Sequence, residues 1–188
     1  GKLMDTNIII RELSTVVQND FPEVNEEWNP IDFYDSIISY LKNDPHQILF
    51  IDAETIHQFP HKKNKHVFTR YITKHNRVPN IIIIFLDDYA SSKISSKPLS
   101  FKMTSHSSDI NYVLDSVIIR DTKQMHFACC LTCNRKEFGF DGESFSRMSP
   151  FKWKHNLLNT NKKWKFKSPY STVFNFRRGL QYLFYYRS

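Results

Sequence analysis

Two patterns of apolar residues follow one another along the chain, and they change near Pro45. In the first, apolar side chains recur at three- and four-residue intervals, which predicts a helix over residues 7–20 and a second helix that starts at Pro30. Asn29 can cap the second helix, and Pro30 suits its first turn because a backbone N–H there would have no helical partner. We therefore expect a helical N-terminal part, with the second helix ending before Pro45.

After Pro45 the pattern changes to short apolar and β-branched runs, which are typical of strands. The run over residues 80–86 is too apolar for a strand with a wet face, so it predicts a central strand that is covered on both sides. The order predicts an α+β fold, with helices first and then a mainly antiparallel sheet. Strands are predicted over residues 47–51, 66–73, 80–86, 110–120, 125–133, 136–140 and 179–187, and a loop over residues 91–98.

The composition fits one folded domain over residues 1–188, in which residues 1–77 form a helical segment and residues 78–188 a sheet segment. With 40 % hydrophobic residues and 16 Phe, the chain can fill a core. No apolar run reaches the roughly 20 residues that cross a bilayer, so no membrane partner is expected. The three cysteines lie close together in one run, which is no disulfide framework and favours an intracellular compartment, cytoplasmic or nuclear.

The formal net charge is +7, and basic residues gather over residues 61–66 and 150–167. A basic surface attracts phosphate polymers and acidic proteins alike. Two alternatives to a protein interface stay open: a solvated basic face above tryptophans that belong to the core, and a nucleic-acid surface, for which no base-reading motif is present. The candidate partner-binding residues are Lys152, Trp153, Lys154, Lys162, Lys163 and Trp164.

The run from His126 to Cys133 combines a histidine with a CxxC motif and raises the question of a zinc site. Tetrahedral zinc needs four converging ligands, and the sequence has no cysteine outside this run. If the run is a strand, its side chains alternate between two faces, so the sulfurs of Cys130 and Cys133 point apart. We therefore expect no metal and no cofactor, and cysteines that serve as structural residues.

Four motifs follow one another in the second half of the chain. They are VPNIIIIFLDDY (78–89), INYVLDSVIIRD (110–121), HFACCLTCNRKEFGFDG (126–142) and GLQYLFYYR (179–187). Their order resembles the C-terminal half of the catalytic domain of ubiquitin-specific proteases, which are papain-like deubiquitinases. The third motif resembles the histidine box of that family, and the other three resemble its strands. The resemblance covers residues 78–188 and implies the palm part of the protease fold, whereas residues 1–77 match no part of it.

The resemblance implies catalytic roles for His126 and Asp141. A cysteine hydrolase needs an imidazole that pairs with the thiolate and later protonates the leaving amine, and a side chain that orients the imidazole. By resemblance, His126 is the base and Asp141 its orienter. A hairpin turn at Asn134 and Arg135 would bring the two side by side. The alternative is an exposed histidine at a strand end and an unrelated aspartate in a turn.

The chain departs from the family at the nucleophile. The family carries its cysteine in an upstream GN-x-C turn, and this chain has no cysteine before Cys129. Four strand residues separate Cys130 from His126, about 13 Å, whereas a base must lie within about 3 Å of its nucleophile. Met125 replaces the glycine that precedes the histidine of the family, and the zinc-binding fingers of the family are missing. The sequence thus resembles a thiol protease without containing a plausible nucleophile.

Three functions agree with these features, in the following order. The first is a non-catalytic, protease-like module that binds a protein partner, for which the resemblance suggests a ubiquitin-like protein. The second is the C-terminal part of an active ubiquitin- or ubiquitin-like-specific thiol protease whose cysteine lies upstream, and Gly1 in place of an initiator methionine agrees with such a fragment. The third is a basic domain that binds nucleic acid.

Overall fold

The structure is a computed structural model, and it describes residues 8, 11, 12, 15, 47–52, 62–94, 97–105, 108–123, 126–142, 148–166 and 172–188. The chain divides into two compact units, Gly1–Pro45 and His46–Ser188. In the first unit, the described residues Ile8, Arg11, Glu12 and Thr15 are helical, where the sequence predicts a helix. The predicted second helix lies outside the described residues, and a single domain over the whole chain stays a prediction.

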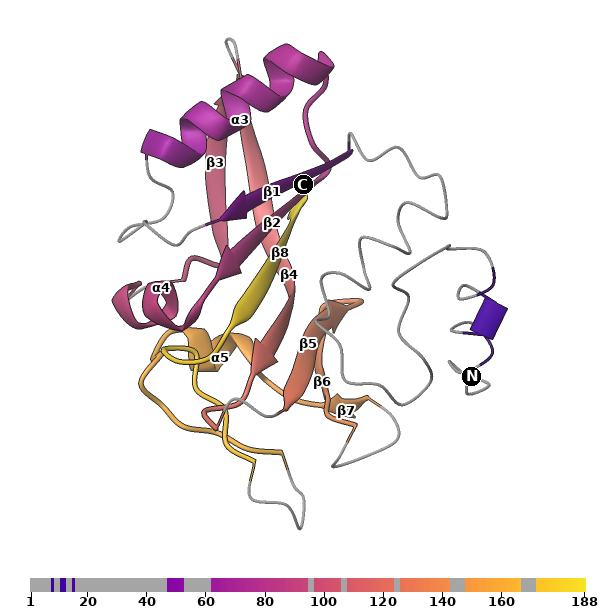
Figure 1. Cartoon of the computed structure of the whole chain (residues 1–188), viewed down its shortest axis with the longest axis vertical. Coiled ribbons are helices and arrows are strands. Elements are labelled where there is room, and N and C mark those ends of the chain that lie inside the picture. Colours follow the sequence, from indigo (N-terminus) through magenta and orange to yellow (C-terminus); the bar gives the residue numbers. More distant parts are fainter. Residues whose placement is uncertain are drawn as a thin grey trace. The chain divides into compact units, whose positions relative to one another are not determined.

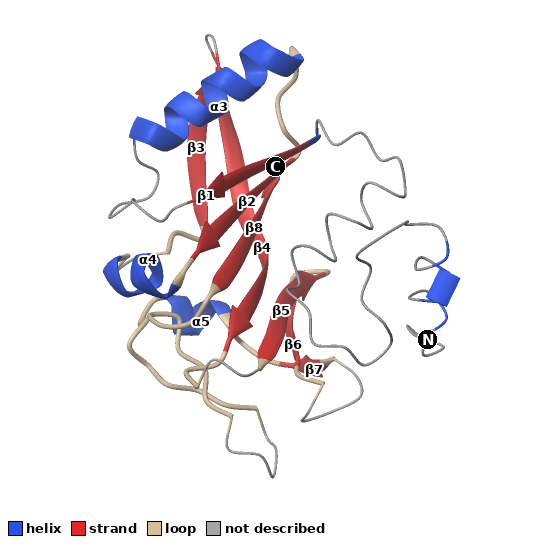
Figure 2. Cartoon of the chain, in the orientation of Figure 1, coloured by secondary structure: helices blue, strands red, loops and turns tan. Residues whose placement is uncertain are grey.

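A sheet of eight strands organises the described part of the second unit (Figures 1 and 2). The strand order is β1-β2-β8-β4-β5-β6-β7, and β3 pairs with β4 off this path. Only β1 and β2 run parallel, so the fold is α+β with a mainly antiparallel sheet, as predicted. The strands are β1 (Ile48–Asp52), β2 (Ile81–Leu86), β3 (Ser100–Ser105), β4 (Ser108–Arg120), β5 (Phe127–Cys133), β6 (Lys136–Phe140), β7 (Ser149–Pro150) and β8 (Gln181–Arg187).

The centre of the sheet is covered on both faces. Ile82, Ile83 and Ile84 of β2 follow one another in sequence and are all buried, although neighbouring side chains of a strand point to opposite faces. The same holds for the residues of β8 from Tyr182 to Tyr185. This confirms the central strand that the sequence predicts over residues 80–86.

Helix α3 (Lys62–His75) replaces the strand predicted over residues 66–73, which was wrong. Its β-branched and aromatic residues favour a strand, but Phe68, Tyr71 and Ile72 repeat at helical spacing and are buried on one helix face. Figure 1 shows α3 lying across the sheet, and it contacts β3 and β1. The helix ends where Asn76 adopts φ 50°, a left-handed conformation that asparagine tolerates.

Helix α4 (Asp88–Lys93) corrects part of the loop predicted over residues 91–98. Asp87 caps this helix, because its carboxylate accepts a hydrogen bond of 2.6 Å from the backbone N–H of Ala90. Strand β3 was not predicted either. It contains only two apolar residues, Phe101 and Met103. They are two positions apart, so they lie on the same face of the strand, and both are buried.

The segments on either side of the short helix α5 (Lys154–Leu157) contribute to a cluster of aromatic side chains. Trp164 stacks on Phe174 with ring centroids 4.8 Å apart, and the backbones of these two residues also form a β-bridge. Phe166 packs close to β6 at Gly139, where a Cβ atom would lie 2.4 Å from the Phe166 ring. This cluster forms one continuous core with the sheet.

Candidate functional site

The hairpin of β5 and β6 places His126 and Asp141 at the same end. Residues Asn134 and Arg135 form its two-residue turn with φ values of 49° and 63°, the left-handed pair that a tight hairpin requires. His126 comes directly before β5 and Asp141 directly after β6. The predicted hairpin and its turn are therefore confirmed.

The side chains of His126 and Asp141 form a hydrogen bond. His126 Nε2 lies 2.5 Å from Asp141 Oδ1, as the spacing about the turn predicts. The Asp141 side chain is only 1 % exposed and the His126 side chain 21 %, so the carboxylate is enclosed while the ring reaches the surface. A ring held through Nε2 has Nδ1 as its second nitrogen for proton transfer, which is the arrangement that an oriented general base needs.

A second aspartate, which the sequence analysis did not single out, holds the backbone of His126. Asp121 is buried at the end of β4, and its carboxylate accepts hydrogen bonds of 3.1 Å from the backbone N–H groups of Lys123 and His126. The backbone N–H of Asp121 in turn donates to the carbonyl of His126 at 2.8 Å. Because these bonds close the loop between β4 and β5, they fix the backbone of His126, from which the imidazole ring extends.

The start of β8 supports the same loop. The N–H of Thr122 donates to the carbonyl of Val173, and the N–H of Arg120 donates to the carbonyl of Leu180, both at 2.9 Å. Gly179 allows this close approach, because its φ is 78° and a Cβ atom would lie 2.3 Å from the carbonyl oxygen of Arg120. The position of His126 thus depends on the segment before β8 as well as on its own hairpin.

None of the three cysteines, all of which the structure describes, is placed as a nucleophile for His126. Cys130 is buried in β5 between Val117 and Gly139, and burial raises the pKa of its thiol well above the ordinary value, with Cys129 and Glu137 adding to the shift. Burial also raises the pKa of the Cys129 thiol. Cys133 is exposed, but it lies beside the turn, at the far end of the hairpin from His126.

Among the described residues, no group of three or more His, Cys, Asp or Glu side chains could hold a metal ion. The described helices also include none that is long and apolar enough to span a bilayer.

The predicted partner-binding segment divides into core residues and surface residues. Trp153 is 0 % exposed and donates from its indole nitrogen to the carbonyl of Leu131, and Trp164 is also buried. This corrects the expectation that the two rings contact a partner, because the core already encloses them. The lysines remain outside: Lys154 is half-buried against the ring of Trp153, and the other three are exposed. These exposed side chains are Lys152, Lys162 and Lys163.

Lys152 belongs to a hollow that the sequence analysis missed, here termed the hairpin hollow. It has a volume of about 460 Å³ and lies at the tip of the β5–β6 hairpin. Its residues are Arg135, Lys136, Glu137, Phe138, Pro150, Phe151 and Lys152. Pairing of β7 with β6 brings Phe138 and Pro150 together, a contact that no local sequence pattern announces.

Comparison with known proteins adds a weak similarity of fold. No protein-family model and no curated protein matches the chain. Among solved structures, the ubiquitin-specific protease Ubp8, from a SAGA DUB module with Sgf11, Sus1 and Sgf73, is similar with a TM-score of 0.38 and 16 % identity. The match covers 59 % of this chain and 24 % of that chain, so this chain corresponds to a minor part of its length. At this level the similarity carries no argument about function.

Proposed function

We propose that residues 78–188 form the histidine-and-aspartate half of a ubiquitin-specific-protease-like domain, and that this half acts as a non-catalytic protein-binding module. One observation supports the proposal above the others: an oriented His126–Asp141 pair occurs together with cysteines that cannot serve it. The order of the four sequence motifs supports a likeness to this family, and the hydrogen bond between His126 and Asp141 agrees with it.

The pair has the chemistry of an acid–base unit. Asp141 is enclosed and accepts from the ring, so it can fix the orientation of the imidazole and stabilise its charged form. Loop bonds from Asp121 hold the backbone of His126 at the same place. Such support from surrounding residues is what an active-site histidine requires, and a solitary surface histidine has no need of it.

The missing part is the nucleophile. Attack on a carbonyl needs a thiolate within hydrogen-bond reach of the base, about 3 Å. Cys130 follows His126 by four residues, all of them within β5, which corresponds to about 13 Å along an extended chain. The raised pKa values of Cys129 and Cys130 also keep these thiols protonated at neutral pH. We therefore expect the 188-residue chain to hydrolyse no ubiquitin-like substrate.

The hairpin hollow is the surface that we assign to the protein partner. Phe138, Pro150 and Phe151 give it an apolar floor, and Arg135 and Lys152 add positive charge. Aromatic and basic side chains around an apolar centre are typical of protein interfaces. The partner that fits is a protein segment with an apolar side chain flanked by acidic residues.

Two measurements test this function together. A fluorogenic substrate made from the C-terminus of ubiquitin should show no turnover above a protein-free control. A protein partner captured from a lysate should survive nuclease treatment and should be lost when the hairpin hollow is reversed in charge by Arg135→Glu and Lys152→Glu. The matched control, Arg70→Glu with Lys165→Glu, changes as many exposed charges outside the hollow and should retain the partner. Retention by both variants would place the interface elsewhere and contradict the proposal, as would recovery that depends on nucleic acid.

The intact His126–Asp141 pair favours one second candidate. In it, the chain is the acid–base half of an active thiol protease, and a cysteine outside the given sequence completes the site. A longer protein that includes the upstream residues should then hydrolyse the fluorogenic substrate, and His126→Ala should abolish that activity. Hydrolysis that is unaffected by His126→Ala would contradict this candidate.

A further inference from the structure

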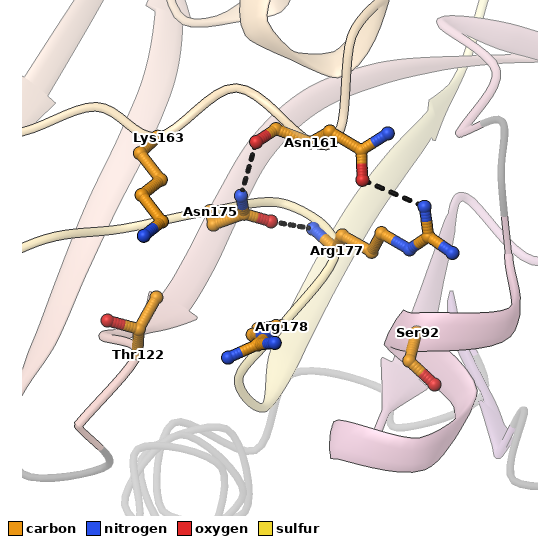
Figure 3. A pocket seen from close by; sticks show the side chains of 7 residues that line it. All are labelled: Ser92, Thr122, Asn161, Lys163, Asn175, Arg177 and Arg178. Atoms are coloured by element: carbon orange, nitrogen blue, oxygen red, sulfur yellow. Dashed lines mark hydrogen bonds between the residues drawn. The ribbon is translucent and has the colours of Figure 1, made fainter.

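A second hollow lies between α4, the β4–β5 loop and the segment before β8, and we term it the cationic hollow (Figure 3). Its volume is about 530 Å³, which is within the range of small-molecule sites. Three cations line it, Lys163, Arg177 and Arg178, together with two amide and two hydroxyl side chains. Apolar and aromatic side chains are absent from this lining, so the hollow offers a ligand only charge and hydrogen bonds.

A turn in the sequence NFRRG (175–179) presents the two arginines. Asn175 begins the turn, and its Oδ1 accepts from the backbone N–H of Arg177 at 2.7 Å, while the N–H of Arg178 donates to the carbonyl of Asn175 at 3.0 Å. Such an asparagine at the first turn position is the usual device for fixing the two residues that follow it. The turn thus fixes the backbone from which both arginine side chains extend.

The turn is anchored from behind. Phe176 is fully buried, and its carbonyl accepts hydrogen bonds from the side chains of Lys97 and Gln181. Burial lowers the pKa of Lys97 to about 7, and both the charged and the neutral amine can donate this hydrogen bond. Gly179 then allows the chain to leave the turn with φ 78°. These contacts make the turn a rigid part of the core.

Lys163 reaches the same hollow from a second loop, which is tied to the turn by amide groups. Asn175 Nδ2 donates to the carbonyl of Asn161 at 2.8 Å, and Asn161 Oδ1 accepts from Arg177 Nη1 at 2.8 Å, as Figure 3 shows. These bonds hold Lys163 and the arginines at a common opening. Asn161 is neutral, so it orients the Arg177 guanidinium without cancelling its charge.

The three positive charges are not balanced within the hollow. Among the described residues that line it, none carries a carboxylate, and neither Lys163 nor Arg178 forms an ion pair through its side chain. Like charges that are gathered without a counter-charge repel one another, and an anion in their midst relieves that repulsion. The hydroxyl group of Thr122 at the edge of the hollow is a further hydrogen-bond donor, whereas that of Ser92 already donates to the carbonyl of Tyr89 at 2.7 Å.

We propose that the cationic hollow binds a small, multiply phosphorylated ligand through Lys163, Arg177 and Arg178. Guanidinium groups match phosphate oxygens with two parallel hydrogen bonds, and a lysine adds a point charge. Three cations in one hollow exceed the need of a single carboxylate and fit two or more phosphate groups. A nucleic-acid strand is less suited, because binding of its bases commonly uses aromatic side chains and this hollow has none.

Isothermal titration of the 188-residue chain with sodium tripolyphosphate tests the inference. We expect saturable one-to-one binding that weakens as sodium chloride is raised. Replacing Lys163, Arg177 and Arg178 by glutamine should weaken binding at least tenfold, since each lost charged hydrogen bond is roughly worth a factor of ten. The single variants Lys163→Gln and Arg178→Gln should each weaken it too, and the fold should be unaffected, because these two side chains form no hydrogen bond or ion pair with the described residues.

The hairpin hollow supplies the matched control. Replacing Arg135, Lys136 and Lys152 by glutamine removes the same amount of positive charge, and it should change tripolyphosphate affinity less than about threefold, as a distant charge change does in salt. Equal weakening by both triple variants, or no saturable binding, would overturn the proposal. A further outcome is that a single-stranded RNA displaces tripolyphosphate and that both triple variants weaken the binding of that RNA. This combined result would identify a phosphate polymer as the ligand and would also overturn the proposal. The proposed protein-binding function does not enter this test, so either can fail alone.

Discussion

The His126–Asp141 pair and the cysteines of β5 lie on one hairpin, yet the surroundings of their side chains differ. The pair is held by hydrogen bonds on all sides, from the partner strand, from the loop after β4 and, through that loop, from the segment before β8. Burial is the main cause that raises the pKa values of the Cys129 and Cys130 thiols, and at Cys129 a backbone hydrogen bond at Phe140 offsets part of the rise. The fold therefore fixes the orientation of an imidazole ring and lowers the reactivity of the neighbouring thiols.

This difference shows that the orientation of the His126 ring and the low reactivity of Cys129 and Cys130 have separate physical causes. An imidazole is oriented by a few polar contacts that a hairpin can provide locally. A reactive thiolate needs an electropositive and partly open surrounding, which the middle of a sheet cannot provide.

Substitution of Gly179 by alanine should destabilise the protein most, by about 3 kcal/mol, because the added Cβ meets the carbonyl oxygen of Arg120 in a left-handed backbone conformation. Urea unfolding measures this free energy. The control is Gly142→Ala, where a Cβ atom has no neighbour within 4 Å. If both variants unfold alike, the segment before β8 does not support the loop that carries His126.

Asp121→Ala should cost about 2 kcal/mol, because two backbone N–H groups lose a buried acceptor. The backbone resonance of His126 in NMR spectra should shift as the loop relaxes. Asp109→Ala is the control, since that aspartate is exposed and its ion pair with Lys102 at 4.0 Å is worth less than about 1 kcal/mol. An unchanged stability of Asp121→Ala would show that the hairpin alone positions the base.

Much of this architecture could be predicted from the sequence, and the failures have identifiable causes. The hairpin, the central strand 80–86 and the His126–Asp141 contact follow from local spacing, because a two-residue turn fixes which residues face each other. Helix α3 was missed because its residue types favour a strand while their spacing favours a helix, and the tertiary contacts of Phe68 and Tyr71 decide the outcome.

The supporting residues of the site could not be predicted in the same way. Asp121 and Gly179 act through contacts between segments that are far apart in the sequence. The burial of Trp153 and Trp164 likewise depends on how the segment after β7 covers the sheet, and their composition alone fits a surface as well as a core. Met125, whose replacement of glycine distinguishes the chain from the protease family, lies outside the described residues.

The cysteines should differ in reactivity as their surroundings differ. Iodoacetamide at neutral pH should alkylate exposed Cys133 roughly tenfold faster or more than Cys129 or Cys130, because burial shields those two thiols and raises their pKa values. A raised pKa means less thiolate at a given pH. The alkylation rate of Cys129 should therefore increase at a higher pH than the alkylation rate of an ordinary thiol does. Peptide mass spectrometry across a pH series measures all three rates, and rapid alkylation of Cys130 in the folded protein would contradict the assigned burial.

The most direct test of the account is reaction with a ubiquitin probe that carries a thiol-directed group at its C-terminus. We expect no covalent adduct of the probe by intact-mass spectrometry, although iodoacetamide modifies Cys133 in a parallel sample of the same protein. The protein should have the same mass before and after incubation, and His126→Ala should give the same result. A ubiquitin adduct on Cys129, Cys130 or Cys133 that disappears in His126→Ala would show that the pair activates a thiol of this chain, and it would contradict the central claim.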